Sequence, residues 1–169
     1  MTGTDTMRAA TARTGIAVWI GTGARLLLAG VLGYAGLVKV SDLTEAGRTV
    51  ALYRLVPAET AQLIGGALPM AELALALLLA VGLATRATAA LSAALMVVYI
   101  AAITSVWARG MSIDCGCFSS GSVVTSGAQW GYAVDIARDL VFLAAACYLV
   151  RYPRTLWSLD GKTLMTKEI

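Results

Sequence analysis

Two cysteines one residue apart could carry chemistry in this sequence. Cys115 and Cys117 flank Gly116 in a polar stretch of a chain that is otherwise rich in apolar residues. A disulfide between them would close a very small and strained ring, and strained disulfides are reduced more easily. The spacing therefore suits exchange with a partner thiol, and both cysteines are candidate catalytic residues. Two loop cysteines without a redox role are the alternative.

The surroundings of the pair limit its chemistry. Asp114 precedes Cys115 and disfavours a thiolate, so activation requires a nearby cation or a helix N-terminus, and Lys39 and Arg109 are the candidate cations. A structural zinc site normally needs four Cys or His ligands, and the chain has no histidine and one further cysteine, Cys147. We therefore predict no metal site, and we expect Cys147 to be an inert buried residue.

The composition indicates an integral membrane protein. Of the 169 residues, 59% are hydrophobic and 14% are charged, whereas soluble domains carry about 25% charged residues. The net charge of +3 comes from Lys and Arg scattered around apolar segments, so it gives no reason to expect a nucleic-acid partner. The lipid bilayer is the expected surrounding of the chain.

Four segments reach the roughly 20 apolar residues that span a bilayer. They are residues 16–38, 61–82, 87–107 and 129–150. The fold class is therefore all-α, a bundle of four transmembrane helices, with a short interfacial helix expected in the 39–60 connection. Residues 1–15 and 151–169 flank the membrane domain, 16–150, and residues 108–128 form the loop that contains the cysteines.

Lys and Arg residues set the orientation, because they are more frequent on the cytoplasmic side. With four spans, one side holds both termini and seven of these residues, and the other holds four. We therefore expect a bacterial inner-membrane protein with both termini in the cytoplasm and the Cys-Gly-Cys loop outside, where disulfides persist.

Charged residues inside the predicted spans form a second candidate site. Glu72, Arg138, Asp139 and Arg25 lie at similar predicted depths, and ionisable groups at membrane depth usually face the bundle interior. They could neutralise one another and fix the helix register. Alternatively, they could line a polar cavity for a proton path or for the head group of a membrane quinone.

Several short elements resemble the MauE family of methylamine-utilisation proteins, within the wider DoxX-like group of small four-helix membrane proteins. They are Arg25-Leu-Leu-Leu-Ala-Gly, Ala35-Gly-Leu-Val-Lys39, Tyr53-Arg-Leu-Val-Pro57, Glu72, Asp114-Cys-Gly-Cys-Phe118, Trp130 and Arg138-Asp139. The similarity covers about residues 25–150, and Asp-Cys-Gly-Cys-Phe is its most specific part.

The resemblance implies a redox-associated protein of the inner membrane. MauE is linked to maturation of the disulfide-rich small subunit of methylamine dehydrogenase, beside a thioredoxin-like partner. We therefore predict that Cys115 and Cys117 exchange electrons with a thioredoxin-like extracytoplasmic protein, and a membrane quinone is the expected electron acceptor by analogy. A non-catalytic scaffold for a redox partner and a small transporter built on Glu72 and Arg138 are the alternatives.

Overall fold

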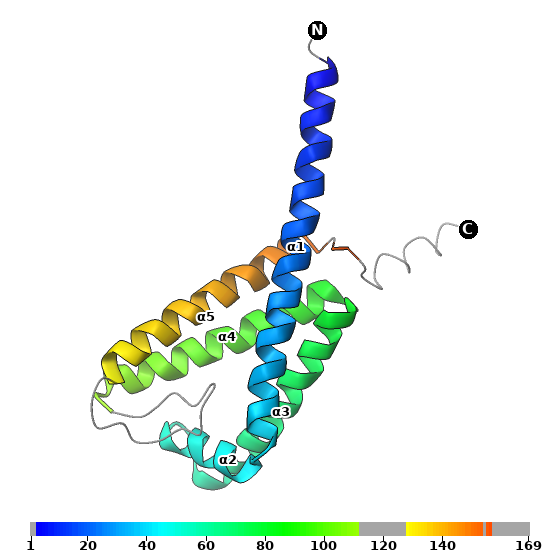
Figure 1. Ribbon diagram of the computed structural model, residues 1–169. Helices are drawn as coiled ribbons and strands as arrows, with labels where there is room; N and C mark the ends of the chain where they lie inside the picture. Colours follow the sequence, from blue (N-terminus) through cyan, green and yellow to red (C-terminus); the bar gives the residue numbers. More distant parts are fainter. Residues whose placement is uncertain (1–2, 112–127, 154, 157–169) are drawn as a thin grey trace.

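The computed structural model describes residues 3–111, 128–153 and 155–156, and this part of the chain is helical, without strands. Five helices follow one another, and the second is much shorter than the rest (Figure 1). They are α1 (Gly3–Val40), α2 (Leu43–Leu52), α3 (Ala58–Val81), α4 (Thr85–Ala108) and α5 (Ala128–Arg151). The all-α prediction is confirmed for these residues.

The helices form two groups. α1 packs along α3, α4 packs along α5, and α2 lies across α3 where α1 ends and α3 begins (Figure 1). The same end of the bundle contains the last turn of α4 and the first turn of α5. We call it the α2 end, and it positions most of the polar groups described below.

Local signals explain where the shorter elements begin and end. The Asp42 side chain accepts a hydrogen bond from the backbone N–H of Glu45 at 2.9 Å, which caps the first turn of α2. Pro57 immediately precedes α3, a position where its fixed backbone angle costs nothing. Gly82 ends α3 with a φ of 70°, a left-handed conformation that glycine adopts readily, and α4 starts three residues later.

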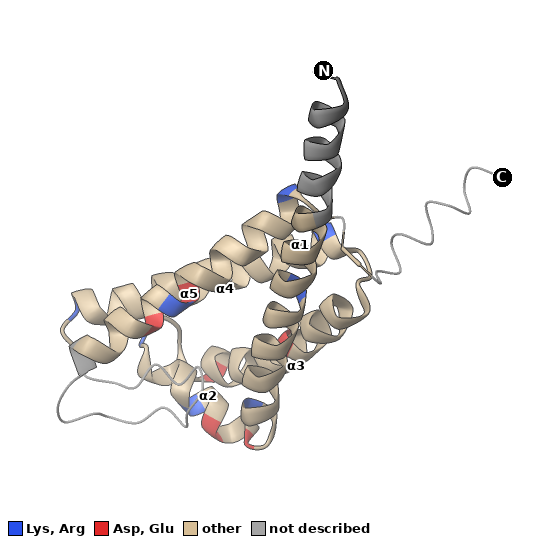
Figure 2. Cartoon of the chain, turned by 45° about the horizontal axis from the view of Figure 1, so that its top comes forward, with Lys and Arg blue, Asp and Glu red and all other residues tan. Residues whose placement is uncertain are grey.

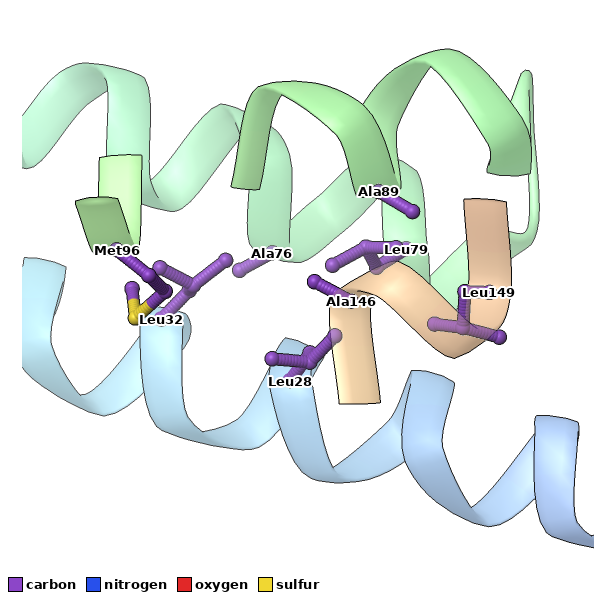
Figure 3. Close-up of a cluster of buried hydrophobic side chains, with 8 residues drawn as sticks. All are labelled: Leu28, Leu32, Ala76, Leu79, Ala89, Met96, Ala146 and Leu149. Carbon is purple, nitrogen blue, oxygen red and sulfur yellow. The ribbon is translucent and has the colours of Figure 1, made fainter. Parts of the chain in front are cut away.

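A cluster of buried apolar side chains joins the two groups of helices (Figure 3). Its members come from α1, α3, α4 and α5: Leu28, Leu32, Ala76, Leu79, Ala89, Met96, Ala146 and Leu149. Three of the eight are alanines, and small residues let helices approach closely where no hydrophobic effect drives their association. The cluster therefore holds the bundle together by close packing.

The outer surface of the helices is apolar as well. Large hydrophobic side chains such as Trp19, Leu63, Leu77, Leu91 and Val141 are exposed on it. Charged side chains are sparse along α3 and α4, and they gather around α2 and in the middle of α5 (Figure 2). A surface of this kind suits hydrocarbon and would be unfavourable in water.

Within the described residues, three helices are long and apolar enough to cross a membrane, in residues Ile16–Val40, Ala58–Val81 and Thr85–Ala108. They correspond to the first three predicted spans. The fourth predicted span is the 24-residue helix α5, but it is not among these three, so the four-span count stays a prediction. The predicted interfacial helix corresponds to α2, whose position relative to a membrane is likewise still a prediction.

Glycines bring α2 and α1 unusually close to α3. A Cβ atom added to Gly65 of α3 would lie 2.4 Å from the Cα of Gly47 in α2, so the two backbones touch. A Cβ on Gly36 of α1 would lie 2.8 Å from Leu73 Cγ and 3.1 Å from the carbonyl oxygen of Pro69. The Gly65 contact requires glycine because the atoms that a larger residue would meet belong to the backbone of α2, whereas at Gly36 the nearest atoms belong to the Leu73 side chain.

Candidate functional site

Cys115 and Cys117 lie outside the described residues, but the structure describes the chain on either side of them. The Tyr132 hydroxyl of α5 donates a hydrogen bond to the Met111 carbonyl at 2.8 Å. Arg109, just after α4, donates to the Tyr53 carbonyl at 2.6 Å. These bonds tie the end of α4 to α5 and to the chain that follows α2.

Apolar packing supports the same junction. Tyr53, Ile103, Val106 and Tyr132 form a second buried cluster, against which Met111 packs. Tyr53 therefore contributes its ring to the packing and its carbonyl to Arg109. Met111 is thus held at the α2 end by a hydrogen bond and by apolar packing.

A buried ionic cluster lies close to this end. The Lys39 ammonium donates to Glu72 Oε1 at 2.6 Å and to the Tyr99 hydroxyl at 3.3 Å, and the Tyr99 hydroxyl donates to the same Glu72 oxygen. Lys39 also lies 5.2 Å from the centre of the Tyr99 ring. We call these three residues, from α1, α3 and α4, the Lys–Glu–Tyr cluster.

The close approach of α1 and α3 positions this cluster. Gly36 lets α1 meet α3 next to Pro69, and Lys39 and Glu72 each follow three residues later along their own helices. Three residues is almost one helical turn, so the side chains stay on the contacting faces. The long Lys39 stem can then reach Glu72 between the helices.

Burial makes the Lys–Glu–Tyr cluster energetically significant. The Glu72 side chain is 0% exposed and the Lys39 side chain is 10% exposed. Glu72 Oε2 has no hydrogen-bond partner among the described residues. A buried carboxylate must be compensated by charge and hydrogen bonds, and Lys39 and Tyr99 supply both at Glu72 Oε1.

A cavity of about 440 Å³ opens beside Lys39 and Tyr99. It lies between the end of α1, α2, the beginning of α3 and the second half of α4. Most of its lining is apolar: Val38, Ala46, Val50, Tyr53, Leu55, Val56, Ile64, Gly65, Leu68, Val98 and Ala102. Its polar lining comprises Lys39, Ser41, Asp42, Glu45, Thr49 and the hydroxyl-bearing Tyr99. Such a cavity can hold an apolar molecule that has a polar end.

A second charged group lies on α5. Arg138 pairs with Asp135 at 2.8 Å and with Asp139 at 3.2 Å. The Asp139 side chain is 5% exposed. The α5 charges therefore face the bundle interior as a paired group.

Arg25 occupies a different place. Its guanidinium donates to Thr155 Oγ1 at 3.2 Å and to the Leu156 carbonyl at 3.1 Å, and the Leu156 N–H donates to Thr22 Oγ1 at 2.9 Å. Arg25 thus fastens the chain that follows α5 to α1. Its expected role in a polar cavity stays a prediction.

The four charged residues expected to share one network are thus divided among three places in the described structure. Glu72 pairs with Lys39, Arg138 with Asp139 and Asp135, and Arg25 with the chain after α5. Cys147 was expected to be buried, and this was wrong, because it is exposed on α5. No group of three metal-ligating side chains occurs among the residues that the structure describes.

Sequence reasoning missed two members of the Lys–Glu–Tyr cluster. Lys39 was assigned to the outer connection, but it lies in the last turn of α1 with its side chain directed inward. Tyr99 lies within the predicted span 87–107, and no motif in the sequence distinguishes it. The Ala-Gly-x-x-Lys element was the available signal, since it combines the glycine of a close helix contact with a lysine one turn later.

Comparison with known proteins identifies one family model that covers most of the chain. Neither the curated proteins nor the solved structures include a match to the chain. The family model described as methylamine utilisation protein MauE matches residues 16–152, which include α2 to α5 and most of α1. The chain therefore belongs to the MauE family of membrane proteins.

Proposed function

We propose that this protein is a thiol–disulfide exchange protein of the bacterial inner membrane. Cys115 and Cys117 form the reactive pair, and the partner is a thioredoxin-like or disulfide-containing protein outside the cytoplasm. The activity supports disulfide formation in exported proteins, which in a methylamine pathway would be methylamine dehydrogenase. Membership of the MauE family supports the setting, and the closely spaced cysteines support the chemistry.

Thiol–disulfide exchange needs no reactant other than this protein and its partner, and its electrons and protons balance. One thiolate attacks a sulfur of the partner disulfide, and a mixed disulfide forms as the partner's second sulfur leaves as a thiolate. The other cysteine then attacks the mixed disulfide, so a Cys115–Cys117 disulfide forms and the partner departs as a dithiol. Two electrons and two protons pass to the partner, and the reverse sequence returns them.

The observation that carries this proposal is the anchoring of the chain before the cysteine pair. Tyr132 and Arg109 bind the chain at Met111 and Tyr53, both at the α2 end. Cys115 follows Met111 by only four residues in the sequence, and four residues span at most about 14 Å. An extracytoplasmic partner can therefore reach the pair if the α2 end faces outward.

The orientation is part of the proposal. If α5 crosses the membrane beside α4, both termini lie in the cytoplasm and the α2 end lies outside. The charges of α5 are compatible with a span because Arg138 pairs with both Asp135 and Asp139 and faces inward. Paired, inward-facing charges are tolerated at membrane depth far better than isolated ones.

Trapping of the thiols in intact cells tests the redox role. The wild type, Cys115→Ser and Cys117→Ser are quenched with acid and labelled with a mass-adding alkylating reagent. The wild type should shift between dithiol and disulfide when the cells receive a reductant or an oxidant. One of the two single variants should accumulate a mixed disulfide with a partner, because the resolving thiol is missing.

Cys147→Ser is the matched control, since it removes an exposed cysteine on α5 and should leave the oxidation state of the pair unchanged. If the pair keeps one oxidation state under all conditions and both single variants support full function, the exchange proposal is wrong. A scaffold role would then explain the protein better.

A further inference from the structure

The cavity beside the Lys–Glu–Tyr cluster has no assigned occupant. We propose that it binds a quinone, with one quinone carbonyl accepting a hydrogen bond from the Lys39 ammonium and the ring lying among the apolar side chains. Electron transfer to this quinone rests on the thiol–disulfide function proposed above, whereas quinone binding does not. The quinone would be the electron acceptor, and Lys39 rather than Arg25, Arg138 or Asp139 would contact it.

The size and walls of the cavity fit such a ligand. A volume of about 440 Å³ lies within the range of about 300–1,000 Å³ that is common for small-molecule sites. Side chains such as Val38, Val50, Leu68 and Val98 offer apolar contacts to a ring. Val98 and Ile64 are also exposed on the outer surface, so the cavity is accessible to a ligand dissolved in the bilayer.

The polar end offers a donor for a carbonyl oxygen. An ammonium group has three N–H donors, and those of Lys39 that the structure pairs are directed to Glu72 and to the Tyr99 hydroxyl. One donor is therefore left for a ligand, and Lys39 lines the cavity. The ion pair with Glu72 holds the Lys39 ammonium group in place, so the donor is oriented before a ligand binds.

The charges around the cavity favour a neutral ligand over an anionic lipid. Glu72 already compensates the positive charge of Lys39, Arg48 pairs with Glu45, and Asp42 adds one further carboxylate to the lining. The lining therefore has no excess positive charge to hold a fatty-acid or phospholipid head group, and Asp42 would repel one. A quinone carbonyl carries no net charge and still accepts a strong hydrogen bond from an ammonium group.

Reduction of a quinone at this site consumes the electrons and protons that oxidation of the cysteine pair releases. When the pair changes from dithiol to disulfide, two S–H bonds break, one S–S bond forms and two electrons and two protons are released. The quinone takes up two electrons and two protons and becomes a hydroquinone. Lys39 is placed to pass one of these protons to the nearer oxygen, with Tyr99 and Glu72 hydrogen-bonded behind it.

Binding can be measured with the purified full-length protein in lipid nanodiscs. The probes are decylubiquinone and menadione, titrated against the fluorescence of the intrinsic tryptophans. Ala102→Leu fills the cavity and should weaken binding about tenfold or more, a change that corresponds to about 1.4 kcal/mol. Ala101→Leu is the matched control, since Ala101 is exposed next to it and does not line the cavity.

A second pair of variants tests the donor. Lys39→Met removes the ammonium group but strands Glu72, so it is compared with Lys39→Met/Glu72→Gln, which leaves no buried charge. Both should bind decylubiquinone about tenfold or more weakly than the wild type. Full binding by the double variant, or equal effects of Ala102→Leu and Ala101→Leu, would overturn the proposal.

Two further measurements separate this proposal from the redox function. Cys115→Ser should bind both quinones normally but should not reduce them after treatment with a dithiol. Oleate, an anionic lipophile, should not compete with the quinones, and tight oleate binding without quinone binding would contradict the inference. A pair that cycles in cells while neither quinone binds would leave the exchange function intact and refute the quinone site.

Discussion

The Lys39–Glu72 pair is the most consequential contact at the scale of single residues. It joins a fully buried carboxylate to an ammonium group whose side chain is 10% exposed, and the Tyr99 hydroxyl bridges both. Removing one partner of a buried pair leaves an uncompensated charge, which costs about 3–5 kcal/mol. Replacing both partners with neutral groups of similar size costs much less.

We therefore predict that Lys39→Met destabilises the protein by about 3–5 kcal/mol and that Lys39→Met/Glu72→Gln recovers more than half of this loss. Reversible unfolding in mixed micelles, followed by circular dichroism, measures both. Arg48→Met is the control, because Arg48 pairs with Glu45 at the surface, where an ion pair contributes about 0–1 kcal/mol. Additive losses in the double variant would show that the two side chains do not interact.

At the scale of helices, the contact between α2 and α3 depends on glycine. The backbones of Gly65 and Gly47 touch, and α2 forms one wall of the cavity beside Lys39. A methyl group at Gly65 would have to push α2 away from α3, because the atoms that it meets belong to the backbone. The position of α2 therefore controls the shape of the cavity.

Gly65→Ala should destabilise the protein by about 1–3 kcal/mol, the usual cost of overpacking. Gly66→Ala is the matched control, since a Cβ at Gly66 meets nothing within 4 Å and alanine favours a helix by about 1 kcal/mol over glycine. Gly66→Ala should therefore be neutral or stabilising. Thermal unfolding compares the two, and protease sensitivity near Arg54 reports whether α2 separates. Equal stability of both variants would contradict the close contact.

Hydropathy along the chain predicted the three long apolar helices, because the need for about 20 apolar residues is a local property. The partner of Glu72 was not predictable in the same way. It depends on the register between α1 and α3, which Gly36 and Pro69 set across a distance in sequence. The placement of Arg25 likewise depends on Thr155 and Leu156, which follow the last helix.

At the scale of the whole molecule, the number of spans and the side of the C-terminus depend on whether α5 crosses the membrane. α5 has the length of a span, but Asp135, Arg138 and Asp139 lower its hydropathy. Their mutual pairing toward the bundle interior offsets that cost. If α5 crosses, Tyr152 lies on the same side as Arg86, and if it does not, Tyr152 lies on the same side as Leu55.

Three variants with one cysteine each distinguish these arrangements in a chain whose native cysteines are replaced by serine. Leu55→Cys, Arg86→Cys and Tyr152→Cys each replace an exposed residue. In intact spheroplasts, a membrane-impermeant maleimide should label Leu55→Cys but should label Arg86→Cys and Tyr152→Cys only after permeabilisation. Labelling of Tyr152→Cys together with Leu55→Cys in intact spheroplasts would mean that α5 does not cross. The Cys-Gly-Cys loop would then face outward without a fourth span.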